Sequence, residues 1–113
     1  MISNELFQFM CSLDESTSEQ IADSLRAKAN NTFVTGYLLS DAHAIGYTKG
    51  ISMVNKLLTS SEGSRKNILK EINNIDLTNY MHNSCKSCWN SGFKEAINHF
   101  SIEVENSVGR NIH

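Results

Sequence analysis

Proline is missing from all 113 residues of this chain. At an average usage of about 5%, roughly five or six prolines would be expected at this length. Proline interrupts helix interiors, so its absence favours long helices joined by short connections. Asparagine and serine are abundant instead, and their short polar side chains supply helix caps and turns. These features favour an all-α fold.

Long apolar stretches are also missing, because a membrane-spanning helix needs roughly 18 or more consecutive apolar residues. Residues 1–5 lack the positive charge and the apolar segment of a secretory signal peptide. We therefore expect a cytoplasmic protein with no membrane partner. In that compartment the three cysteines should be thiols, and their odd number argues against a disulfide framework.

A strong charge of either sign is absent as well, since the net charge is −2 and the pI is about 6.0. The longest basic cluster is the pair Arg65-Lys66. Such a chain has no general attraction for phosphate backbones, so a nucleic-acid partner is not expected. Apolar residues make up 40% of the sequence, which suits one hydrophobic core and one domain over residues 1–113.

Apolar residues at helical spacing predict about five helices, and no stretch alternates at period two for long enough to form a strand. The expected ranges are 5–13, 16–29, about 32–58, 65–73 and about 76–106. Breaks are expected at the asparagine pairs 30–31 and 73–74 and in the Ser-rich residues 59–63. The predicted fold is an all-α compact bundle with its two long helices, about 32–58 and 76–106, crossing at the core.

The two long predicted helices share a strip of small residues. In both of them a small residue recurs at every fourth position, and residues four apart lie on one helix face. The strips are Ala42, Gly46 and Gly50 in one helix and Cys88, Gly92 and Ala96 in the other. Small residues let helix backbones approach closely, so the helices should cross there. We expect Tyr47 and Phe93 to flank the crossing, with Trp89 on the same inner stripe. Alternatively, one strip is open to a partner helix or a ligand.

One grouping has the residue types of a zinc site, namely His82, Cys85 and Cys88 with His99 later. Steps of three along one helix spread these side chains over about 120° of its surface, and His99 lies more than two turns further on. Buried cysteines that bind no metal are the preferred interpretation. We therefore expect no metal and no cofactor, with zinc binding as the alternative.

A helix-turn-helix over residues 18–38 is another alternative, because such a motif places its second helix in the DNA major groove. The turn would be Arg26-Ala27-Lys28, which contains no glycine. The candidate recognition helix is poor in arginine and lysine, and Asp41 follows it. Two packed helices are the preferred interpretation of this stretch.

Enzyme signatures such as G-x-S-x-G, HExxH, a P-loop or a dinucleotide fingerprint do not occur in the sequence. We therefore expect a non-catalytic protein whose partner is another protein. An inhibitor, an immunity protein or a chaperone-type accessory factor of a bacterium or phage fits this size and mild acidity. A homodimer is an alternative, since Phe7, Phe9 and Leu39 have no obvious cover. Other classes left open are a DNA- or zinc-binding regulator and an enzyme with a dispersed site.

Overall fold

A computed structural model describes residues 1–35, 41–75 and 86–111 of the chain, and these residues form five helices and no strand. The helices are α1 (Asn4–Cys11), α2 (Glu15–Thr35), α3 (Asp41–Thr59), α4 (Glu62–Asn73) and α5 (Lys86–Asn111). The prediction of an all-α bundle of about five helices is confirmed. None of the helices in the described part of the chain is both long enough and apolar enough to cross a membrane.

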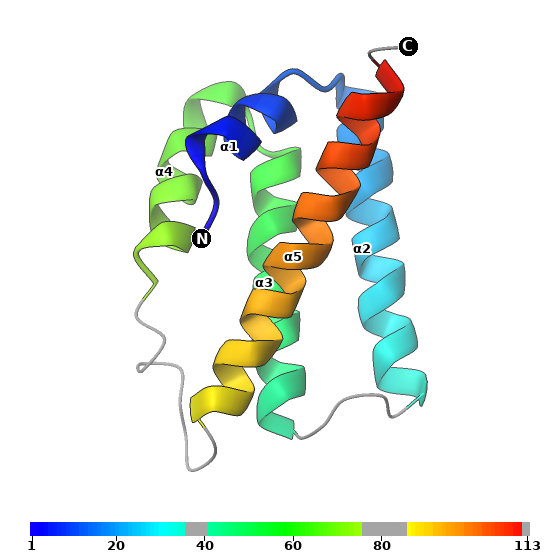
Figure 1. The fold of residues 1–113 in the computed structure, drawn as a ribbon, viewed down its shortest axis with the longest axis vertical. Helices are drawn as coiled ribbons and strands as arrows, with labels where there is room; N and C mark the ends of the chain where they lie inside the picture. Colours follow the sequence, from blue (N-terminus) through cyan, green and yellow to red (C-terminus); the bar gives the residue numbers. More distant parts are fainter. Residues whose placement is uncertain (36–40, 76–85, 112–113) are drawn as a thin grey trace.

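Helices α3 and α5 form the centre of the bundle and share its most extensive contact. In Figure 1, α5 passes obliquely in front of α3, with α2 on one side and α4 on the other. Helix α2 packs mainly on α3, and α1 packs on α5 near the upper end of α4. The bundle is therefore built on a central helix pair with three helices around it.

The hydrophobic core lies along the facing sides of α3 and α5. Its largest fully buried side chains include Tyr47, Phe93 and Phe100 from this pair, Met10 from α1 and Leu25 from α2. Fully burying one apolar side chain of this size stabilises a fold by about 1.5–3 kcal/mol. The core residues of α3 and α5 recur at steps of three and four, as the sequence predicts.

The predicted boundary between the second and third helices is wrong. Helix α2 continues through Asn30-Asn31 to Thr35, and α3 begins at Asp41 instead of residue 32. In a helix interior asparagine costs at most about 0.7 kcal/mol relative to alanine, so an asparagine pair does not have to end a helix. Asparagine permits a helix end without requiring one. The predicted residues 36–40 of this helix lie outside the described part.

Other predicted helix ends also need correction. The last helix is described from Lys86 to Asn111, so it passes Gly109, where we expected it to end. A Cβ atom on Gly109 would meet no atom within 4 Å, so this glycine occupies an open helix surface. The predicted residues 76–85 of this helix lie outside the described part. Helix α4 begins at Glu62, with Ser61 as its N-cap in place of Ser64.

The N-terminal segment is attached to the end of α4 by a pair of hydrogen bonds. The backbone N–H of Ile2 donates to Oδ1 of Asn73 at 2.9 Å, and Nδ2 of Asn73 donates to the Ile2 carbonyl at 3.0 Å. The side chain of Ile2 is buried in the core. Ser3 then caps α1 by accepting a hydrogen bond from the Leu6 N–H at 3.1 Å. These contacts fix α1 next to α4.

Candidate functional site

The small residues of α3 and α5 lie where the two helices pack against each other. A Cβ atom added to Gly46 would overlap the backbone oxygen of Trp89, and one added to Gly92 would overlap the backbone oxygen of His43. A Cβ atom on Gly50 would lie 2.6 Å from the Cβ of Ala96. At these positions the two backbones approach too closely for a larger residue. The strips therefore face each other and are not open to a partner here.

Aromatic and small side chains surround this close approach. Trp89 and Phe93 stack with their ring centroids 5.4 Å apart and an interplanar angle of 11°. Both rings are buried, as are Tyr47 and Ala42 on α3. Cys88 is half-buried and packs against the same core. These residues contribute apolar contacts between α3 and α5.

A polar cluster adjoins the close approach and comes from the same two helices. Nε2 of His43 donates to Oε2 of Glu95 at 2.8 Å. The hydroxyl of Tyr47 lies 2.7 Å from Nδ1 of His99, and Nε2 of His99 lies 3.9 Å from Oε1 of Glu95. Glu95 thus faces both histidines. Its side chain is 45% exposed, whereas that of His43 is 7% exposed.

The protonation of the polar cluster follows from its surroundings. Burial, assisted by the negative charge of Glu95, raises the pKa of Tyr47 to about 12, so the phenol keeps its proton. Burial lowers the pKa of His99, and the positive charge of Lys28 lowers it further, against the opposing effects of Glu95 and Glu103. A neutral His99 accepts a hydrogen bond from the Tyr47 hydroxyl at Nδ1 and directs its Nε2–H toward Glu95. The cluster therefore connects α3 to α5.

Sequence reasoning missed the polar cluster because its partners are 52 positions apart. A signal was present, however. His43 and Tyr47 are four residues apart beside one small-residue strip, and Glu95 and His99 are four apart beside the other. Residues four apart share a helix face, so crossing helices would bring the two pairs together.

The alternative zinc site is only partly covered by the structure. His82 and Cys85 lie outside the described residues. The side chain of His99 is 27% exposed, and its ring nitrogens face Tyr47 and Glu95. Within residues 1–35, 41–75 and 86–111, no three His, Cys, Asp or Glu side chains are arranged to hold a metal ion.

The alternative helix-turn-helix lacks its turn. Arg26-Ala27-Lys28, the expected turn, lies in the middle of the continuous helix α2. Arg26 pairs with Asp23 at 3.1 Å, and Lys28 reaches Glu103 of α5 at 3.6 Å. The helix-turn-helix alternative therefore fails for residues 18–35, and the preferred interpretation of two packed helices is also wrong there, because α2 is one continuous helix from Glu15 to Thr35.

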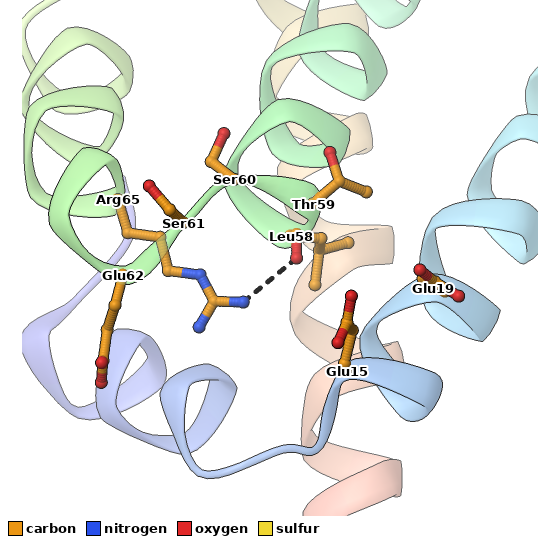
Figure 2. Close-up of a pocket in the computed structure, with 8 residues that line it drawn as sticks. All are labelled: Glu15, Glu19, Leu58, Thr59, Ser60, Ser61, Glu62 and Arg65. Atoms are coloured by element: carbon orange, nitrogen blue, oxygen red, sulfur yellow. Dashed lines mark hydrogen bonds between the residues drawn. The ribbon is translucent and has the colours of Figure 1, made fainter.

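One surface hollow is acidic and lies between the start of α2 and the connection from α3 to α4. The residues around it are Glu15, Glu19, Leu58, Thr59, Ser60, Ser61, Glu62 and Arg65. Figure 2 shows the Arg65 side chain reaching the end of α3, where Nη2 donates to the Leu58 carbonyl at 3.1 Å. A helix leaves its last carbonyls without partners, so this arginine acts as a side-chain cap for α3.

A second hollow, here called the α1–α4 groove, has an apolar floor and a basic rim. Its lining residues are Asn4, Phe7, Gln8, Lys66, Leu69, Lys70, Asn73 and Asn74. Phe7 is buried and Leu69 is half-buried, whereas the polar lining residues are exposed. The prediction that Phe7 lacks cover is therefore wrong. Phe9 is half-buried against the core, and Leu39 lies outside the described residues.

Comparisons with protein-family models, with curated proteins and with solved structures found no match to this chain.

Proposed function

We propose that this chain is a small non-catalytic protein that acts by binding another protein, as an inhibitor, an immunity protein or a chaperone-type accessory factor does. The observation that carries the proposal is the α1–α4 groove. Apolar side chains of Phe7 and Leu69 lie at its base, and exposed polar side chains surround them. An apolar centre with a polar rim is the usual composition of a protein-binding surface.

The polar cluster between α3 and α5 supports binding over catalysis. A general acid or base has to reach a proton on a bound substrate. Here the side chain of His43 is 7% exposed and Tyr47 is buried. Glu95 and His99 are 45% and 27% exposed, but they are hydrogen-bonded to His43 and Tyr47 respectively. These groups join two helices, and in that role they keep the scaffold of a binding surface rigid.

The charge distribution supports a protein partner over a nucleic acid. Binding to DNA commonly involves roughly 6–10 phosphate contacts by basic side chains. The α1–α4 groove offers two lysines, Lys66 and Lys70, and the net charge of the chain is −2. The charged residues that line the acidic hollow are three glutamates and one arginine.

The attachment of α1 to α4 supports a surface that exists before the partner binds. Asn73 holds the backbone of Ile2 through two hydrogen bonds, and the first turn of α1 follows directly. Binding surfaces that change little between the free and the bound state lose less conformational entropy on association. We therefore expect the groove to retain its shape in the complex.

Affinity capture from an extract of the native host tests the proposal. Leu69→Asp places a charge at the base of the groove, and Ile102→Asp is the matched control at an exposed position of α5. We expect the wild type and Ile102→Asp to capture the same protein in about equal amounts, and Leu69→Asp to capture at least about tenfold less. Circular dichroism checks that both variants are folded. Recovery of nucleic acid alone, or equal capture by a folded Leu69→Asp, would contradict the proposal.

A further inference from the structure

We infer that the α1–α4 groove binds an acidic amphipathic helix of the partner protein, whose carboxylates pair with Lys66 and Lys70. This inference rests on the proposed function and adds the chemistry of the partner. The apolar side of the bound helix would cover Leu69, which is half-buried and lies beside the buried Phe7 at the base of the groove. Recognition of a helix in an apolar groove is a recurrent mode of protein binding.

The charge of the groove is the first observation. Lys66 and Lys70 are exposed and both line it, and none of its described lining residues is acidic. Glu62 and Glu71, the acidic residues of α4, do not line the groove. Neither lysine makes an ion pair with another residue in the described part of the chain. The rim therefore has a local positive charge on a chain whose net charge is negative.

The spacing of the lining residues is the second observation. Positions 66, 69, 70 and 73 of α4 follow the pattern i, i+3, i+4 and i+7, so they lie on one helix face. Positions 4, 7 and 8 of α1 follow the first part of the same pattern. Lys66 and Lys70 are one helical turn apart, at about 5–6 Å between Cβ atoms. Two carboxylates one turn apart on a bound helix have a matching spacing.

A second copy of the chain is the other candidate for the occupant of the groove. Glu15 and Glu19 of α2 are also one helical turn apart and lie on the acidic hollow. They could pair with Lys66 and Lys70 of a second copy. However, this contact would join two different surfaces, so it would leave one groove and one acidic hollow open unless the copies closed into a ring. A separate acidic helix fills the groove without requiring ring closure, so we favour it.

A photo-crosslinker inside the groove identifies the occupant directly. The full-length chain carries p-benzoylphenylalanine at position 8, which lines the groove from α1, and is irradiated in native host extract. Mass spectrometry then reads the sequence attached to it. We expect a segment of another protein with apolar residues at i, i+3 and i+7 and with Asp or Glu one turn apart. A segment of this same chain, a basic segment or a nucleic acid would overturn the inference.

Charge reversal supplies the second arm of the experiment. Lys66→Glu combined with Lys70→Glu should reduce the crosslink yield at least about tenfold, because two attractive pairs become repulsive. Lys94→Glu, at an exposed position of α5 outside the groove, is the matched control and should leave the yield unchanged. If Leu69→Asp abolishes capture but the double reversal does not, the acidic helix is wrong while the protein-binding proposal stands. If no protein is captured by any version of the chain, both are wrong.

Discussion

The hydroxyl of Tyr47 and Nδ1 of His99 lie 2.7 Å apart and join α3 to α5. Tyr47→Phe removes this hydroxyl and keeps the aromatic ring that packs in the core. The imidazole nitrogen then loses its partner, so we expect the free energy of unfolding to fall by about 1–2 kcal/mol. Urea denaturation of both chains at pH 7.5 measures the difference. An unchanged midpoint would show that the bond does not stabilise the helix pair.

The same tyrosine predicts how stability changes at alkaline pH. Its pKa is raised to about 12 in the folded chain, against an ordinary value of 10.0. Between these two values the unfolded chain loses the Tyr47 proton while the folded chain keeps it. Stability should therefore fall as the pH rises from about 10 to about 12. Tyr47→Phe should have a shallower slope there, as measured by thermal unfolding. If the wild type and Tyr47→Phe lose stability equally steeply between about pH 10 and pH 12, the pKa of Tyr47 in the folded chain has its ordinary value.

His99 predicts a second pH effect, in the acid direction. Its pKa is lowered in the folded chain by burial and by Lys28, against the opposing charges of Glu95 and Glu103. The unfolded chain therefore binds a proton first as the pH falls below about 6.5. The contribution of His99 to stability is fully present above that pH and is lost as the pH falls toward the lowered pKa. NMR titration of the His99 ring measures this pKa, and a value above 6.5 would contradict the prediction.

The same substitution should have opposite effects at Gly46, which lies in the contact between α3 and α5, and at Gly63, which lies outside it. Gly46→Ala would bring its Cβ onto the Trp89 backbone oxygen, so α3 and α5 have to move apart. We expect a loss of about 1–3 kcal/mol, larger for Gly46→Leu. Gly63→Ala is the matched control, because a Cβ there meets no atom within 4 Å. The control should gain about 0.5–1 kcal/mol from the better helix propensity of alanine. Chemical denaturation compares both variants with the wild type, and a Gly46→Ala variant as stable as Gly63→Ala would rule out the close approach.

The sequence predicts features that depend on the spacing within one helix. The stripes of α3 and α5 and the positions of Gly46, Gly50 and Gly92 follow from steps of three and four, because such residues share a helix face. Features that need the register between helices were not predicted. The bond between Tyr47 and His99 and the α1–α4 groove both join residues more than 50 positions apart. The end of α2 was mispredicted because Asn30-Asn31 is compatible with both a helix end and a helix interior.

The Asn73 side chain hydrogen-bonds the segment before α1 to the end of α4. Its amide makes two hydrogen bonds to the backbone of Ile2, at 2.9 and 3.0 Å, and both are partly buried. Asn73→Ala removes the two bonds at once and leaves the N–H and the carbonyl of Ile2 without this partner. We expect the free energy of unfolding to fall by about 1–3 kcal/mol. Because Ile2 would detach first, the amides of α1 should exchange with deuterium faster than those of α3.

Asn67→Ala is the matched control for this substitution, since Asn67 is an exposed asparagine of the same helix. It should leave the free energy of unfolding within about 0.5 kcal/mol of the wild-type value. The α1 amides should exchange with deuterium at the wild-type rate. The comparison also bears on the binding surface, because Asn73 fixes the position of α1 beside Lys66 and Leu69. A folded Asn73→Ala chain with a mobile α1 should capture less partner protein than Asn67→Ala. If α1 exchanges at the wild-type rate in Asn73→Ala, the groove is held together by apolar packing instead, and capture should be unaffected.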